Sequence, residues 1–191
     1  FMSHFIRVSE EELHTANQQL TQLAIRDTLT NLLNRREMER LLKEAVALSQ
    51  AQKTPLSVIL MDIDHFKAVN DNYGHDMGDK VLLTVSDAIS RTIRGSDAGC
   101  RWGGDEFFII LQGAPLAVAG RVGERIRRRV EEAKMPFSHN VTISVGAAVF
   151  DPEQDNELQL FKNADEALYQ AKKAGRNVVY ALGFGRVSSE E

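Results

Sequence analysis

Residues 56–64 form the segment that most constrains the fold of this chain. Their sequence, LSVILMDID, is an almost continuous apolar run that ends in Asp62 and Asp64. Runs of this kind are typical of central strands that are buried on both faces of a sheet. Carboxylates at the end of such a strand are where α/β proteins place metal and phosphate chemistry. We therefore expect a strand over 56–62, with Asp62 as a metal ligand and Asp64 as the cap of a helix that begins near His65.

A second acidic segment lies at residues 99–110, GCRWGGDEFFII. The Gly103-Gly104 pair between two strand-like runs predicts a tight hairpin, because primed turns require positive φ at both central positions. The glycines also let a ligand approach the backbone closely. Asp105 and Glu106 follow directly. Taken alone, the segment fits an acidic hairpin tip on the surface as well as a binding site.

Asp62 and Asp105 are expected on neighbouring strands, where their carboxylates can act together. Mg²⁺ prefers hard oxygen ligands and often takes only one or two carboxylates, leaving the other positions to water and substrate phosphates. The two residues therefore form a candidate metal site. Ligand type alone does not distinguish Mg²⁺ from Mn²⁺.

Composition limits the class of protein. A chain of 191 residues suits one domain with an extension, and its net charge of −4 without a long basic run argues against nucleic-acid binding. The single cysteine, Cys100, excludes an internal disulfide. No apolar stretch approaches the roughly 20 residues of a membrane span, and no secretory signal is visible. We expect a cytoplasmic domain that itself makes no membrane contact, whether free or tethered through a sensor domain.

Hydrophobic periodicity and turn residues predict alternating helices and strands. The expected helices cover 10–26, 35–50, 76–94, 115–133 and 158–174, and the expected strands cover 56–62, 97–102, 105–111, 141–149 and 177–181. The first helix carries a heptad-like stripe that fits either a short coiled coil or packing onto the domain. Asp27 either caps the first helix of the domain or contributes to a pocket, and capping is favoured.

Five motifs in order give the chain a clear resemblance. They are DTLTNLLNRR at 27–36, MDIDHFKAVNDNYGHDMGDKVL at 61–82, RWGGDEF at 101–107, TISVGAA at 142–148 and ADEALYQAKKAGRN at 164–177. The chain resembles the GGDEF domain, the catalytic domain of bacterial diguanylate cyclases. The resemblance implies an α+β fold with a central, mostly antiparallel five-stranded sheet flanked by helices, similar to nucleotidyl cyclases and the polymerase palm. We expect an N-terminal signalling or linker helix over 1–26, the domain over 27–182 and a flexible tail over 183–191.

The resemblance implies that two GTP molecules are condensed into cyclic di-GMP, with pyrophosphate release, at a homodimer interface. It assigns Mg²⁺ or Mn²⁺ to Asp62, the backbone carbonyl of Ile63 and Asp105. Asp105 is also the family's candidate base, although metal ligation would lower its basicity. Glu106 would support the metal site or serve the hairpin structurally. An upstream sensory domain is expected outside this chain.

Further residues match the family's substrate contacts. The side chains of Lys172 and Arg176, one helical turn apart, would grip the triphosphate, although such a charge run is more often only a solvated polar face. The other matching positions are the backbone of Phe66 and Lys67 at the phosphates, Asn70, His75 and Asp79 near the guanine, and Gly103 and Gly104 in the hairpin.

Arg94 and Asp97 form an RxxD pattern just upstream of the hairpin, in the register of the family's product-inhibition site. Guanidinium and carboxylate groups fit guanine edges and phosphate, and Arg125 is a possible second contributor. The structural alternative is an arginine at a helix end beside a turn aspartate. A silent domain that binds cyclic di-GMP or senses GTP without turnover is the alternative function.

Overall fold

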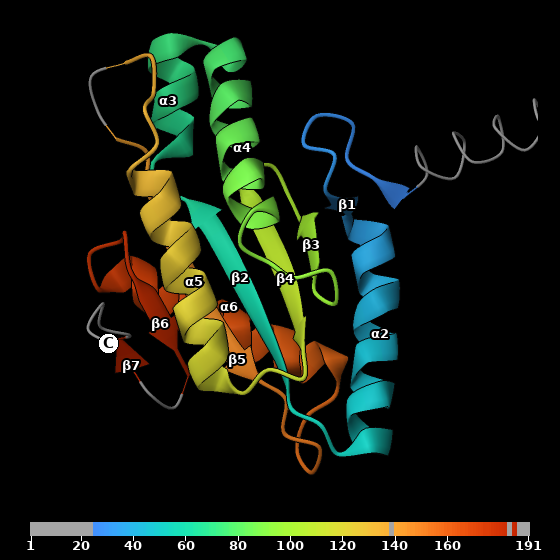
Figure 1. Cartoon of the computed structure of the whole chain (residues 1–191). Helices are drawn as coiled ribbons and strands as arrows, with labels where there is room; N and C mark the ends of the chain where they lie inside the picture. The colour runs from blue at the N-terminus through green and yellow to red at the C-terminus, as the bar shows by residue number, and fades with distance from the viewer. Residues whose placement is uncertain (1–24, 138–139, 183–184, 187–191) are drawn as a thin grey trace, which may run out of the picture.

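The apolar run of residues 56–64 forms the middle strand of a mixed sheet. The computed structural model describes residues 25–137, 140–182 and 185–186. Within them, seven strands follow the order β1-β3-β4-β2-β5-β6-β7 (Figure 1). Their bounds are β1 Leu33–Asn34, β2 Leu56–Ile63, β3 Ala98–Arg101, β4 Glu106–Gln112, β5 Ile143–Val149, β6 Val179–Ala181 and β7 Gly185–Arg186.

The sheet is mostly antiparallel, as expected. Only the β1–β3 and β5–β6 pairs are parallel among the described strands. The expected number of five strands is wrong for the described residues. The two additional strands, β1 and β7, are two-residue segments at the edges of the sheet. Segments this short carry no periodic signal that a sequence pattern can reveal.

Helices cover both faces of the sheet, which explains why β2 is apolar along its length. The helices are α2 Arg35–Gln52, α3 Phe66–Tyr73, α4 His75–Ser90, α5 Leu116–Glu131 and α6 Glu157–Lys173. Ile59 and Met61 of β2 pack with α4 and α5, while Val58 and Leu60 pack with α2 and α6. Alternate residues of a strand point to opposite faces, so Asp62 is on the side of α2 and α6.

Helix α6 lies very close to β5. A Cβ atom at Gly146 would overlap the backbone of Ala164 and Leu168 on α6. A glycine inside a strand permits this kind of close backbone approach. The position of α6 relative to the sheet is therefore set by a residue without a side chain.

Most helix bounds agree with the expectations to within a few residues. Asn34 caps α2 by accepting a hydrogen bond from the Glu37 amide at 3.0 Å. Helix α4 ends at Ser90 rather than residue 94, because the chain then enters turns. The expected helix over 10–26 lies outside the described residues except at its end. Within the described residues, none of the helices is long and apolar enough to cross a membrane.

The predicted hairpin is present, but the prediction of a two-residue primed turn is wrong. Strand β3 ends at Arg101 and β4 begins at Glu106, so the loop has four residues. Neither Gly103 nor Gly104 adopts a left-handed φ. The longer loop distributes the chain reversal over more residues, so neither glycine needs that conformation. Trp102, the first loop residue, packs on Phe161 of α6 with ring centroids 4.8 Å apart.

Candidate active site

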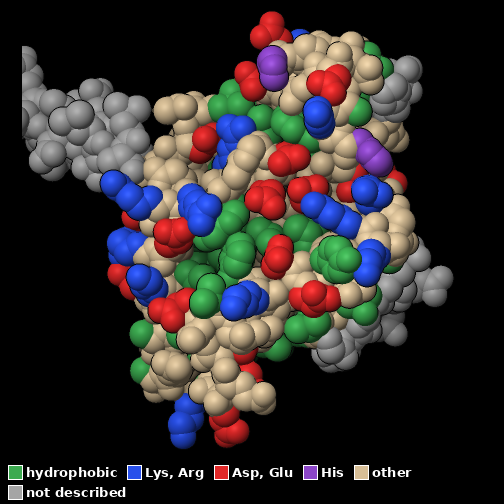
Figure 2. All heavy atoms as spheres, turned by 180° about the vertical axis from the view of Figure 1, so that it is seen from behind, with side chains coloured by type: hydrophobic (Ala, Val, Ile, Leu, Met, Phe, Trp, Pro, Cys, Tyr) green, Lys and Arg blue, Asp and Glu red, His purple; other side chains and the backbone are tan. Residues whose placement is uncertain are grey.

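Three carboxylates meet where β2 and β4 lie side by side. The strand register pairs Asp62 directly with Glu106. The backbone of Asp105 lies beside them, because its carbonyl accepts a hydrogen bond from the Ile63 amide at 3.2 Å. Figure 2 shows the side of the molecule that is at the back in Figure 1, where acidic side chains gather with lysine and arginine around them. Gly103 lies beside Glu106, since a Cβ at Gly103 would come within 2.9 Å of Glu106 Oε2, the end of a flexible side chain.

The cluster holds more negative charge than nearby groups neutralise. Burial raises the pKa of Asp62, and the charges of Asp105 and Asp64 add to this rise while the hydrogen bond from Lys172 opposes it. Burial also raises the pKa of Glu106, reinforced by Asp62 and Asp105. Lys172 Nζ lies 2.9 Å from Asp62 Oδ2. Like charges directly opposite each other destabilise a sheet, so this arrangement favours binding of a cation.

The donors at this cluster suit a hard metal ion. Within the described part of the chain, no group of three or more histidine, cysteine, aspartate or glutamate side chains has the arrangement of a complete metal site. Mg²⁺ often uses one or two carboxylates and completes its shell with water and phosphate oxygens. Asp62 and Asp105 with the carbonyl of Ile63 therefore fit an ion that arrives with a phosphate substrate.

The expectation that Asp64 caps the following helix is wrong. His65 precedes α3 with a left-handed φ of 57° and no side-chain cap is present. The Asp64 carboxylate instead accepts hydrogen bonds from Ser144 Oγ at 2.6 Å, Thr142 Oγ1 at 2.7 Å and the Asn177 amide at 3.0 Å. These partners are 78 to 113 residues away in the sequence, beyond the reach of a local capping rule.

Helix α3 begins immediately after this segment, at Phe66. The amides of Phe66 and Lys67 belong to its first turn, where N–H groups have no partner within the helix. Such amides can bind an anion. The structure thus brings the start of α3 to the end of the strand that carries Asp62.

Asn70 on α3 faces α4. Its Oδ1 atom is buried and has no hydrogen-bond partner within the described residues. A Cβ atom at Gly78 would overlap this oxygen, so the glycine makes room for it. His75 and Asp79 are exposed, one turn apart at the start of α4. An unsatisfied acceptor and a nearby carboxylate match the N–H donors on the edge of guanine.

Lys172 and Arg176 lie on either side of the end of α6, close to residue 174, where the sequence predicts that this helix ends. Helix α6 ends at Lys173, and Gly175 and Arg176 adopt left-handed φ values of 107° and 64°. A left-handed glycine is a common helix terminator. Lys172 contacts Asp62 from the last turn of α6, whereas Arg176 extends from the following loop.

Arg94 and Asp97 form a self-contained turn, since Asp97 Oδ2 accepts a hydrogen bond from the Arg94 amide at 2.9 Å. Arg125 on α5 reaches the same region and donates to the Thr92 carbonyl at 3.2 Å. The three residues line a pocket of about 90 Å³. Gln112 also lines it, and its buried Nε2 has no partner within the described residues.

Several contributing residues were not identified from the sequence. Arg101 donates to the Gly104 carbonyl at 2.8 Å and lies 3.5 Å from Asp27, which braces the hairpin loop. Asp27 does not cap a helix, because its carboxylate accepts from the amide and hydroxyl of Thr30 within a turn. Asn177 was also missed, although the Gly-Arg-Asn triplet after α6 signals left-handed backbone.

The chain is similar to known proteins in sequence and in fold. A family model described as "Diguanylate cyclase, GGDEF domain" matches residues 24–178. The chain is 45% identical over 157 residues to "Diguanylate cyclase DosC" of Escherichia coli (strain K12), covering 80% of this chain and 34% of DosC. It is 42% identical over 163 residues to "Response regulator PleD" of Caulobacter vibrioides (strain NA1000 / CB15N), covering 83% of this chain and 36% of PleD.

This chain therefore spans about a third of the length of these curated relatives. A solved structure of the coiled coil and GGDEF domain of DgcB from Caulobacter crescentus, in complex with c-di-GMP, is also similar. Its TM-score is 0.85 at 31% identity, covering 92% of this chain and 94% of that one. With a family match over most of its length and a shared fold, the chain belongs to the GGDEF domain family of diguanylate cyclases.

Proposed function

We propose that this chain is a diguanylate cyclase. In this reaction, the 3′-hydroxyl oxygen of each GTP attacks the α-phosphorus of the other. Two phosphoanhydride bonds break, two pyrophosphates leave, and cyclic di-GMP forms. The observation that carries the proposal is the group of three carboxylates at Asp62, Asp105 and Glu106, with Lys172 paired to Asp62 at 2.9 Å.

Asp62, Asp105 and the backbone carbonyl of Ile63 are the proposed ligands of a Mg²⁺ or Mn²⁺ ion. When bound, this ion neutralises phosphate charge and lowers the pKa of the attacking hydroxyl. Glu106 lies opposite Asp62 and adds negative charge to the site. The excess of carboxylate charge over nearby cations supports this assignment.

The triphosphate is expected to lie against Lys172, Arg176 and the first amides of α3, at Phe66 and Lys67. Lysine and arginine neutralise phosphate charge, and a helix start provides unpaired N–H donors. Gly103 and Gly104 leave the hairpin loop without side chains beside the carboxylates. These groups come from three separate segments that converge on the end of β2.

The guanine base is expected between α3 and α4. The buried Oδ1 of Asn70 lacks a partner within the described residues and would accept from guanine N1 or N2. The exposed carboxylate of Asp79 would accept from the same edge of the base. His75, one turn before Asp79, would contribute a contact at the rim.

We further propose that catalysis requires a homodimer. Each domain holds one GTP, so a single copy supplies only half of the reactants for two symmetric bonds. Dimerisation would then regulate turnover, in response to an upstream sensory domain of a longer cytoplasmic protein.

Cyclic di-GMP is the proposed inhibitor at Arg94, Asp97 and Arg125. These residues line one pocket. The amide nitrogen of Gln112 beside them has no partner among the described residues, which supports the binding of a polar ligand there. The DgcB structure is in complex with c-di-GMP. The same pocket would let a silent domain act as a receptor for cyclic di-GMP, which is the second candidate function.

One experiment separates the two functions. Purified protein, stripped of nucleotide, is incubated at high concentration with GTP and Mg²⁺, and cyclic di-GMP and pyrophosphate are quantified. Two pyrophosphates per cyclic di-GMP establish the cyclase. If no product forms even after dimerisation is enforced through an N-terminal leucine zipper, while cyclic di-GMP still binds, the receptor function holds instead.

A further inference from the structure

Three consecutive residues after α6 have left-handed backbone. Their φ values are 107° at Gly175, 64° at Arg176 and 48° at Asn177. Glycine adopts this conformation without cost, whereas other residues hold it only when the surrounding structure compensates. The segment carries Arg176, so whatever stabilises the turn also determines where this guanidinium lies.

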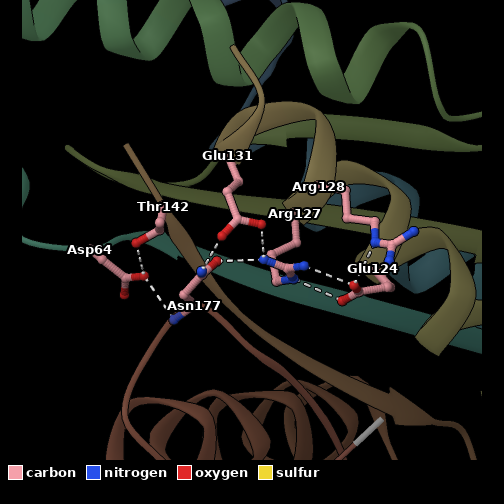
Figure 3. A network of polar contacts seen from close by, with 7 residues as sticks. All are labelled: Asp64, Glu124, Arg127, Arg128, Glu131, Thr142 and Asn177. Atoms are coloured by element: carbon pink, nitrogen blue, oxygen red, sulfur yellow. Dashed lines mark hydrogen bonds and ion pairs between the residues drawn. The ribbon is translucent and has the colours of Figure 1, made fainter. Parts of the chain in front are cut away.

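Asn177 holds the end of this turn (Figure 3). The start of the turn is closed on α6, because the Arg176 amide donates to the Ala171 carbonyl at 3.2 Å. Its amide donates to Asp64 Oδ2 at 3.0 Å. Its side-chain oxygen accepts from Arg127 Nη1 at 2.6 Å, and its side-chain nitrogen donates to Glu131 Oε1 at 2.7 Å. Hydrogen bonds therefore hold the main chain of Asn177 to Asp64 and both polar atoms of its side chain to α5.

The partners of Asn177 are themselves held firmly. Arg127 is only 11% exposed and bonds Glu124 twice at 2.8 Å and Glu131 at 2.7 Å, all on α5. These hydrogen bonds, led by the one to Glu124, raise the pKa of Arg127 above its ordinary value. Asp64 is fixed by the hydroxyls of Thr142 and Ser144.

Asp64 also connects the turn to the carboxylate cluster. It follows Asp62 by two residues and is the first residue after β2, the strand that carries the proposed metal ligand. Its bond to the Asn177 amide ties the loop of Arg176 to that strand. A rotation of this loop would move Arg176 relative to Lys172, which pairs with Asp62 from the preceding helical turn.

We propose that Asn177, held by Arg127 and Asp64, is a positioning residue for the triphosphate of the substrate. It holds the end of the loop that carries Arg176, so that this guanidinium acts together with Lys172 although α6 has already ended. The proposal rests on the proposed function, because it takes Lys172 and Arg176 as the phosphate-binding pair. It predicts an effect on the phosphates and none on the guanine contacts of Asn70 and Asp79.

The test compares Asn177→Ala with Asn156→Ala, a matched control at the opposite end of α6. Asn156 caps α6 by accepting from the Gln159 amide at 2.9 Å, so its loss weakens the helix without touching the loop. The affinities for GTP and GMP are measured with Mg²⁺ by calorimetry, and folding is checked by circular dichroism. We expect Asn177→Ala to weaken GTP binding roughly 10-fold or more, since small misplacements of binding groups are costly, and GMP binding much less.

Two further variants sharpen the outcome. In a background of Arg176→Ala, the Asn177→Ala change should add little loss of GTP affinity, because the group that it positions is gone. Asn177→Gly retains the left-handed backbone and the amide bond to Asp64, so it keeps the test valid if the alanine variant does not fold. It should lower the GTP-to-GMP affinity ratio in the same direction, by a smaller factor.

An unchanged affinity ratio in folded Asn177→Ala or Asn177→Gly overturns the positioning role. The role is also rejected if Asn156→Ala lowers the ratio as much, because general loosening of α6 would then explain both variants. The readout is binding and requires no turnover. Failure of the native chain to make cyclic di-GMP would therefore count against the proposed function alone.

Discussion

The carboxylate cluster and the RxxD turn at Arg94 and Asp97 differ in how far their charged groups are satisfied by hydrogen bonds within the protein. At the carboxylate cluster, Asp62, Asp105 and Glu106 are close together and partly buried, with Lys172 as the cation beside them, and burial raises the pKa values of Asp62 and Glu106. At the RxxD turn, by contrast, Asp97 accepts a hydrogen bond from the Arg94 amide and the turn closes on itself.

The two regions therefore differ in whether a bound ligand is needed to offset repulsion between charges. Clustered like charge lowers the stability of the free protein, which is typical of sites kept for binding or catalysis. The turn is accounted for by its own hydrogen bonds. Its position on a pocket points to a ligand, as does the Gln112 amide nitrogen there, which has no partner among the described residues. Substitutions in the two regions should therefore have opposite effects on stability.

The largest effect is expected from Asp105→Asn, which removes a charge from the cluster. We expect cyclic di-GMP synthesis to fall by roughly 100-fold or more, as for loss of a group that stabilises developing charge. Melting temperature should be unchanged or higher, because like-charge repulsion decreases. Product analysis and thermal melting check this, with Asp87→Asn on the surface of α4 as the control. Near-normal turnover would remove Asp105 from the mechanism.

Next in size is Arg94→Ala at the turn. The side chain is exposed, so folding and basal turnover should be preserved. Loss of a charge-assisted contact to the product should raise the inhibitory concentration of cyclic di-GMP roughly 10-fold or more. Arg91→Ala is the matched control, since Arg91 is exposed nearby and pairs with Asp87 at 2.8 Å. An inhibition curve identical to that of the native protein would reject the assignment.

A smaller effect is expected from Asp97→Ala. The variant loses the acceptor for the Arg94 amide, at a cost of about 1 kcal/mol, which corresponds to a melting temperature lower by roughly 2–4 °C. Asp97→Asn retains an acceptor oxygen and should melt close to the native protein. Equal melting of all three proteins would show that the turn does not depend on this bond.

The smallest effect has the opposite sign. Glu106→Gln removes a charge that faces Asp62, so we expect a gain of up to about 1 kcal/mol in the free energy of unfolding, accompanied by slower synthesis. Denaturant unfolding monitored by circular dichroism measures the gain. If this variant is less stable than the native protein, the Glu106 carboxylate is needed for structure. Substitutions in the cluster and in the RxxD turn would then not have opposite effects on stability.

The cluster could be predicted from the sequence because its signals are local. The apolar run before Asp62 and the strand-like runs around Gly103 and Gly104 predict two strands, and adjacent strands align their ends. The hairpin was correct even though its turn geometry was not. Gly103 lies beside the side chain of Glu106, three residues ahead, a proximity that the glycine pair alone does not show.

The prediction was wrong where the same side chain fits both a local capping role and a contact with distant residues. Asp64 fits the capping rule for the next helix, yet its hydrogen-bond partners are Thr142, Ser144 and Asn177. There a local rule gave way to tertiary contacts that a single sequence does not contain. The end of α6 depends on local signals, and the predicted end at residue 174 differs from the observed one by a single residue.

Sequence patterns were enough to predict the family, the mixed sheet around β2 and the identity of the clustered carboxylates, because these depend on patterns within about ten residues. Tertiary packing was needed to reveal how Asn177 links α5 to the segment after the strand of Asp62. It also places Asn70 against Gly78, with a side-chain oxygen that has no partner among the described residues. Hydrogen bonds between distant segments depend on which surfaces pack together, and that is settled only when the whole core forms.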